Sequence, residues 1–152
     1  MNPTATHLAT DESDLQSFLA RLSPATALRV RTLAHAWAAA GGSLAVGRLS
    51  VRLVAAHDPA HPYTAATLHA RGGTAALELS RVLLHAHGIG PAAWQAWCDE
   101  RPELRSHGFV AQAKFPAVRL DALPDAALAR LALGLRDLAQ MRPAPAADAP
   151  HA

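Results

Sequence analysis

The chain has 152 residues, of which 51% are hydrophobic and 17% are charged, and its formal net charge is +2. This composition is typical of one folded domain with a sizeable core, and it excludes a disordered chain. Cys98 is the only cysteine, which excludes an internal disulfide. No apolar run approaches the roughly 18–20 residues of a membrane-spanning helix, and the start lacks a signal-peptide pattern. We therefore expect a cytoplasmic protein without a membrane partner.

Three segments are predicted along the chain. Residues 1–9 are expected to form a flexible arm, residues 10–140 a single domain, and residues 141–152 a disordered tail rich in proline and alanine. The first helix of the domain is expected to begin near Asp11, because carboxylates favour the positive end of a helix. Its apolar stripe has helical spacing and comprises Leu15, Phe18, Leu19 and Leu22.

A second helix and a hairpin follow. Ser23-Pro24 predicts the helix start, since serine caps helices and proline suits the first turn, and Gly41-Gly42 predicts its end. Alternating apolar and polar residues predict one strand over 45–54 and a return strand over 63–69. The segment 57–62 contains two prolines and is therefore expected to be a loop.

The second half of the chain favours helices. Residues 74–87 fit a helix better than a strand, and a short helix is expected after Gly90-Pro91. Residues 115–121 predict a third strand at a sheet edge, because Pro116 cannot donate to a ladder, and residues 124–140 predict the last helix. The predicted fold is α+β, a small antiparallel sheet of about three strands with one central hairpin and helices packed on one face.

The histidines invite a metal interpretation. His57 and His61 are four residues apart, His85 and His87 are two apart, and His69 could lie near either pair. A zinc or iron site needs three or four converging ligands, and neighbours two apart on a helix point in different directions. We therefore predict no metal site, and a histidine-lined metal or small-molecule site is the last of three functional alternatives.

Nucleophilic chemistry is not favoured either. Cys98 lies beside Asp99 and Glu100, which would raise the pKa of its thiol and suppress the reactive thiolate. Trp94 and Trp97 could stack on a flat ligand, but their helical spacing favours a place in the core. We predict no catalytic residue and no cofactor, and the sequence favours a binding protein over an enzyme.

The hairpin carries the candidate binding face. Arg48, Ser50 and Arg52 share one side of the predicted strand, and His69 extends that side from the return strand. No acidic residue lies between Leu15 and His57, whereas several arginines do. Arginine binds phosphate through two parallel hydrogen bonds, so nucleic acid is the predicted ligand. Alternatively, these arginines pair with acids such as Glu78 or Asp99 on a solvated surface. The predicted contact residues are Arg29, Arg31, Arg48, Ser50, Arg52 and His69.

The C-terminal third resembles a known group of families. "HGF" at His107–Phe109 leads into "KFPAVRLD" at Lys114–Asp121 and then "LPDAALARLALGLRDLA" at Leu123–Ala139. Over about Arg29–Ala139 this layout is similar to small bacterial α+β domains of the MmcQ/YjbR type and related families of unknown function. The resemblance implies an α+β fold and a double-wing DNA-binding role. The tryptophan-bearing strand of those families has no counterpart here, where Phe115 stands instead, so no functional residue is carried over.

Two leading functions therefore come from the sequence. The first is a small binding module that contacts DNA or RNA through the basic hairpin face. The second is a protein-interaction or homodimerisation module that uses the hairpin edge or the leucine stripe of the last helix. That stripe comprises Leu128, Leu131 and Leu135.

Overall fold

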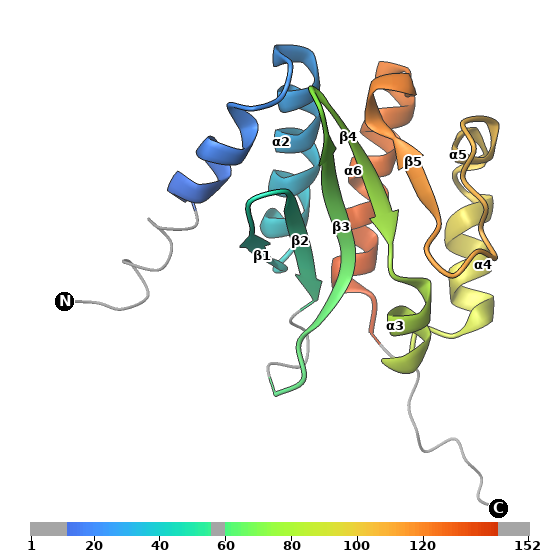
Figure 1. Ribbon diagram of the computed structural model, residues 1–152. Coiled ribbons are helices and arrows are strands. Elements are labelled where there is room, and N and C mark those ends of the chain that lie inside the picture. The colour runs from blue at the N-terminus through green and yellow to red at the C-terminus, as the bar shows by residue number, and fades with distance from the viewer. Residues whose placement is uncertain (1–11, 56–59, 143–152) are drawn as a thin grey trace, which may run out of the picture.

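The computed structural model describes residues 12–55 and 60–142 (Figure 1). The predicted arm, His57 and nearly all of the predicted tail lie outside these residues.

The described chain has an α+β fold with a five-stranded antiparallel sheet in the order β1-β2-β3-β4-β5. The predicted fold class and antiparallel pairing are confirmed, whereas the prediction of about three strands is wrong. The strands are β1 (Ser43–Val46), β2 (Ser50–Ala55), β3 (Tyr63–Arg71), β4 (Thr74–Leu79) and β5 (Ala117–Arg119).

The first additional strand arises because the predicted strand over 45–54 is a hairpin in itself. β1 and β2 pair antiparallel, and the backbone N–H of Gly47 donates to the carbonyl of Ser50 at 2.8 Å. Arg48 and Leu49 form the turn between them. Glycine and asparagine mark such turns in a sequence, and neither residue is of these types. The alternating pattern therefore predicted one continuous strand.

The second additional strand is β4, which replaces the first half of the helix predicted over 74–87. Arg71 pairs with Thr74, so Gly72 and Gly73 form a two-residue turn, with Gly72 at φ +62. Glycine adopts this left-handed conformation readily, and a Gly-Gly turn is typical of a hairpin. β4 then pairs with β3 on one side and β5 on the other, and this pairing outweighs the helical preference of its alanines and leucines. The helix α3 (Arg81–Ala86) follows.

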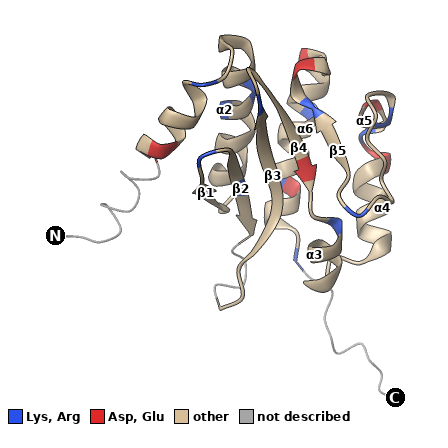
Figure 2. Ribbon diagram, in the orientation of Figure 1, with Lys and Arg blue, Asp and Glu red and all other residues tan. Residues whose placement is uncertain are grey.

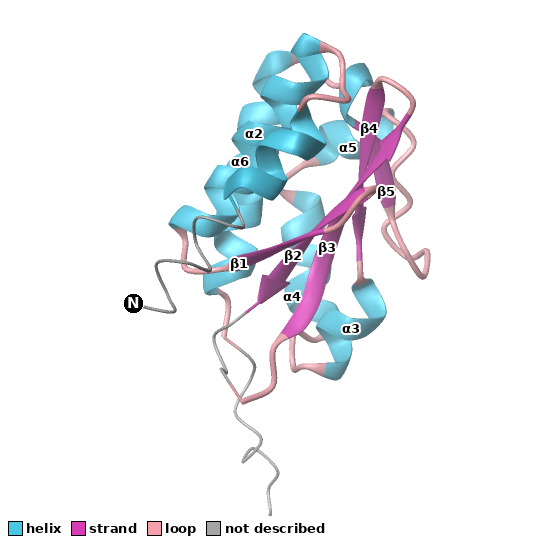
Figure 3. Cartoon of the chain, turned by 60° about the vertical axis from the view of Figure 1, so that its left-hand side comes forward, coloured by secondary structure: helices cyan, strands magenta, loops and turns pink. Residues whose placement is uncertain are grey.

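Two long helices, α2 (Pro24–Ala39) and α6 (Asp125–Gln140), cover one face of the sheet (Figure 3). α2 begins as predicted: the Ser23 hydroxyl accepts the N–H of Thr26 at 3.3 Å, and proline follows the cap. Leu131 and Leu135 of α6 are 1% and 0% exposed, so the leucine stripe packs within the chain and offers no surface to a partner. The core between helices and sheet includes Val30, Leu33, Trp37, Val51, Leu53, Leu68, Leu77, Leu131, Leu135 and Leu138.

The remaining helices lie at the margins of the sheet. α4 (Pro91–Asp99) and α5 (Pro102–Ser106) lie beyond β5, and helical residues 12–19 precede α2 (Figure 1). A short 3-10 helix, η1 (Leu120–Ala122), joins β5 to α6. Among the described helices, none combines the length and the apolar character that crossing a bilayer requires.

Candidate binding surface

The candidate surface is the face of the sheet opposite α2 and α6, which looks toward the viewer in Figure 1. Val51 and Leu53 of β2 are buried in the core, so Arg52 between them must point to the opposite face. Arg52 pairs with Thr67 of β3, and the same alternation places side chains of β4 and β5 beside it. We name this surface the open face. It comprises Ser50, Arg52, Thr67, His69, Arg71, Ala76, Glu78, Ala117 and Arg119.

The open face brings together Ser50, Arg52 and His69 of the predicted contact residues. Ser50 lies directly opposite His69 in the β2–β3 register. Arg48 lies outside the strands, in the exposed turn between β1 and β2, and its carbonyl accepts a hydrogen bond from the Arg21 guanidinium. Arg48 therefore stands at the margin of the surface rather than in line with Ser50 and Arg52.

Arg29 and Arg31 lie in the helix layer on the other side of the sheet. The Arg29 side chain is only 18% exposed. Its guanidinium donates to the carbonyls of Leu120 and Leu123 and pairs with Asp125 at 2.9 Å. Arg29 thus fastens α2 to η1 and to the start of α6. Arg31 is exposed, and its guanidinium lies 3.4 Å from the Gln16 side-chain oxygen. The structure does not bring these two arginines to the open face.

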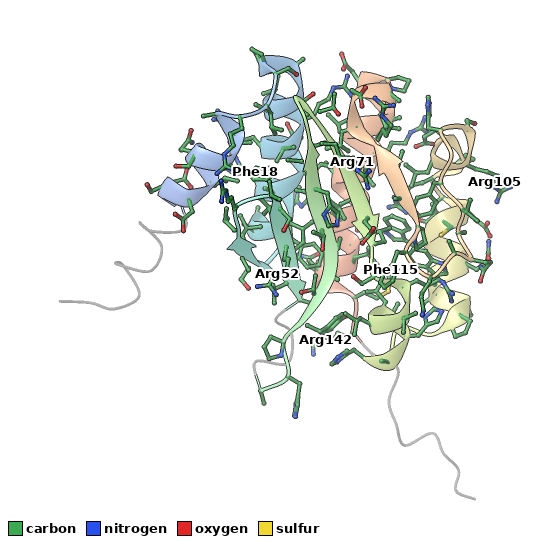
Figure 4. All side chains as sticks on the ribbon, viewed as in Figure 1. Phe18, Arg52, Arg71, Arg105, Phe115 and Arg142 are labelled. Atoms are coloured by element: carbon green, nitrogen blue, oxygen red, sulfur yellow. The ribbon has the colours of Figure 1, made fainter. Side chains whose placement is uncertain are left out.

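The charge of the open face is positive but interrupted. His69 Nε2 lies 3.5 Å from Glu78 Oε1, and Arg119 pairs with Asp121 at 2.9 Å. The alternative that the hairpin arginines pair with Glu78 or Asp99 is not what the described residues show, because Glu78 faces His69 and Asp99 accepts a hydrogen bond from Gln95. Within the described chain, no hydrogen bond or ion pair engages the Arg52 guanidinium, which is exposed beside Thr67 (Figure 4). Arg52 is therefore available to an anionic ligand.

Sequence reasoning missed two basic members of this surface, Arg71 and Arg119. Arg71 ends β3 and follows His69 by two positions, so it projects to the same side. The Gly-Gly turn after it was the signal that the strand continued this far. Arg119 alternates with the buried Val118 on β5, and β5 joins the sheet beside β4. Its alternation was visible in the sequence, but the pairing of β5 with β4 was not.

The histidines are dispersed in the described residues. His85 Nδ1 lies 2.8 Å from the carbonyl of Ile89, and the His87 ring stacks on Tyr63 with centroids 4.0 Å apart. Within residues 12–55 and 60–142, no group of three or more His, Cys, Asp or Glu side chains could hold a metal ion. His69, His85 and His87 instead make contacts within the fold.

Trp94, Trp97 and Cys98 are buried, as predicted for core residues. The indole N–H of Trp94 donates to Ala111 and that of Trp97 to Gly134, both at 2.9 Å, so neither ring is free to stack on a ligand. Burial, with a smaller contribution from Asp99, raises the pKa of the Cys98 thiol to about 11. The thiol is therefore protonated at neutral pH and is a poor nucleophile.

Comparison of the chain with protein-family models, with curated proteins and with solved structures gave no match. The resemblance to MmcQ/YjbR-type domains therefore stays a prediction from the sequence. The functional argument depends on the geometry of the open face.

Proposed function

We propose that the protein is a non-enzymatic module that binds single-stranded nucleic acid through the open face. The observation that carries the proposal is the projection of basic side chains from β2, β3 and β5 on the side that α2 and α6 leave free. These side chains are Arg52, His69, Arg71 and Arg119.

The distribution of charge supports an anionic ligand. Acidic positions lie mainly on the helices and their ends, with one acidic segment on β4 (Figure 2). That segment is Glu78, which His69 faces at 3.5 Å. A phosphate chain on the open face thus has the guanidinium groups of Arg52 and Arg71, which form no ion pair within the described chain, and that of Arg119, which pairs with Asp121. Guanidinium groups bind phosphate by charge-assisted hydrogen bonds that are often bidentate.

The spacing of the basic groups suits an extended chain. Side chains two residues apart on a strand stand roughly 7 Å from each other, and neighbouring strands lie about 4.8 Å apart. Arg52 on β2 and Arg119 on β5 are three strands apart and offset by two residues in register, or roughly 16 Å, with His69 and Glu78 between them. A flexible single strand can follow this shallow arc and place successive phosphates on these groups. A rigid duplex meets fewer of them, which is why we favour single-stranded ligands.

The proposal is tested by fluorescence anisotropy with labelled single-stranded and double-stranded DNA and RNA at low salt. We expect binding of single strands that weakens as salt rises, because phosphate contacts release counterions. Replacement Arg52→Ala is expected to weaken binding several-fold, in line with the loss of a phosphate contact. Absence of binding to every nucleic acid at low salt would sink the proposal.

A matched control separates the open face from general positive charge. Arg105 is exposed at the end of α5, far from the open face in Figure 4. Arg105→Ala removes the same charge as Arg52→Ala, and we expect it to leave the affinity almost unchanged. Equal losses in the two variants would indicate non-specific attraction rather than a contact at the open face.

A further inference from the structure

The two edges of the sheet are protected to different degrees. β5 has three residues, follows Pro116 and carries Arg119, and these features discourage pairing with another strand. β1 contains only Ser43, Leu44, Ala45 and Val46, with no charge and no proline. Unpaired, uncharged edges are the ones that accept another strand. The β1 edge is therefore the site on this sheet where strand addition is expected.

The backbone groups on the β1 edge can be assigned from the hairpin. Since the N–H of Gly47 donates to Ser50, alternation along the antiparallel ladder directs Ala45 toward β2 and directs Leu44 and Val46 outward. Among the described residues, no backbone hydrogen bond reaches that outer edge of β1. The outward N–H and C=O groups of Leu44 and Val46 are thus open to a partner.

The side chains of Leu44 and Val46 are also incompletely covered. Both lie on the core side of the sheet, opposite Leu53 and Val51, yet they are only half-buried while their partners are fully buried. The apolar core consequently reaches solvent along this edge. A strand added there would satisfy the backbone groups and extend the cover over these side chains at the same time.

We propose that β1 pairs antiparallel with β1 of a second copy of the chain about a two-fold axis, joining the two sheets into one. The register follows from the outward groups: Leu44 of one copy bonds to Val46 of the other, and Ala45 faces Ala45 in a non-hydrogen-bonded pair. This inference depends on the strand edge alone and is independent of the ligand. It also places the two open faces side by side, so that each copy contributes Arg52 to a shared basic surface.

Self-pairing in the antiparallel direction is favoured by what lies at the two ends of β1. The antiparallel arrangement sets Arg48 of one copy near Gly41 and Gly42 of the other, which are uncharged and small. A parallel arrangement would bring the Arg48 side chains together, and like charges repel. A four-residue strand that is complementary to itself also suits the closed two-fold symmetry of most homo-oligomers.

Cysteine cross-linking tests the register. In a non-hydrogen-bonded antiparallel pair the Cα atoms lie about 4.5 Å apart, within the range a disulfide spans. Under mild oxidation Ala45→Cys is expected to form a disulfide-linked dimer. Ala117→Cys, exposed on the opposite edge strand, is the matched control and is expected to stay monomeric on denaturing gels. Cys98 is buried and is not expected to compete.

Sedimentation of the full chain gives the second measurement. We expect a reversible dimer that dissociates on dilution, and Val46→Lys is expected to lower the association constant at least ~10-fold by placing a charge on the edge. Circular dichroism checks that this variant is folded. If it does not fold, the cross-linking experiment still tests the proposal, because it does not use this variant. A monomer at all concentrations with equal cross-linking at positions 45 and 117 overturns the proposal. A dimer that cross-links at neither position also overturns it, because it would use another surface.

Discussion

The arginines of the helix layer and those of the open face have different roles. Arg101 is 6% exposed, donates to the carbonyl of Trp97 at 2.7 Å and lies 4.5 Å from the centre of the Trp97 ring. Arg29 is held by carbonyls of the segment that precedes α6. Arg52, in contrast, projects from the sheet without such partners in the described chain. An arginine is therefore available to a ligand only where the fold leaves its guanidinium free.

The largest effect is expected from Arg101→Ala. The change removes a buried side chain that packs on Trp97 and pairs with Asp137 at 3.3 Å, and it leaves a cavity between α4 and α6. We expect a loss of about 3 kcal/mol in the free energy of unfolding, the cost of deleting a large buried side chain. Urea denaturation measures it. A loss below about 1 kcal/mol would show that Arg101 does not stabilise the helix layer.

Gly134→Ala tests the same region from the other side. A Cβ at Gly134 would lie 2.1 Å from the Arg101 Nε, so the guanidinium would have to move. We expect a destabilisation of about 1–3 kcal/mol, as for overpacked cores, although alanine normally favours a helix by about 1 kcal/mol. In an Arg101→Ala background the clash is absent, and the same substitution is expected to stabilise. A double-mutant cycle with no coupling would contradict this packing account.

Arg29→Ala is expected to cost about 2 kcal/mol, because the carbonyls of Leu120 and Leu123 lose a charged donor. Arg31→Ala provides the control on the same helix. Arg31 is exposed, so its removal is expected to change stability by less than about 0.5 kcal/mol. Thermal or urea unfolding compares the two variants. Similar losses for both would mean that the contacts of Arg29 do not fasten α2 to the C-terminal half.

The Cys98 thiol predicts a pH dependence at alkaline pH. Its pKa rises from the ordinary 9.0 to about 11 in the folded chain, so the unfolded chain loses the proton first. The contribution of this thiol to the free energy of unfolding is therefore fully present below pH 9, and it is lost as the pH rises from about 9 to about 11. Alkylation by iodoacetamide is expected to be slow at pH 9 in the native protein and fast in urea. Equal rates would contradict the burial of the thiol.

The smallest effect on stability is expected for Arg52→Ala. Arg52 is exposed on the open face, so the free energy of unfolding should change by less than about 0.5 kcal/mol. The same variant is expected to weaken nucleic-acid binding several-fold. A large loss of stability would place Arg52 in the same structural class as Arg29 and remove the contrast between the two layers.

Most of the helix layer could be predicted from the sequence. The cap at Ser23, the glycine ending at Gly41 and the stripes of α2 and α6 are local signals, and the structure contains both helices. The strands were harder because their determinants are local only in part. The turn at Arg48-Leu49 has no typical turn residue, and residues 74–79 become β4 only through pairing with β3 and β5.

The candidate site was predictable in part for the same reason. Alternation on β2 correctly placed Ser50 and Arg52 on one face, and the hairpin added His69. The hydrogen bonds that hold Arg29 in the helix layer could not be predicted, because its carbonyl partners lie more than ninety residues away in the sequence. Arg119 could not be joined to the site either, since the order of strands depends on tertiary packing.

The most direct test of the central claim is the salt dependence of binding. The logarithm of the association constant for single-stranded DNA is plotted against the logarithm of salt concentration for the wild type and for Arg52→Ala/Arg119→Ala. Losing two phosphate contacts is expected to reduce the slope by about 1.4. The control Arg105→Ala/Arg136→Ala removes the same charge from exposed helix positions and should keep the wild-type slope. Equal slopes in all three proteins would contradict the account.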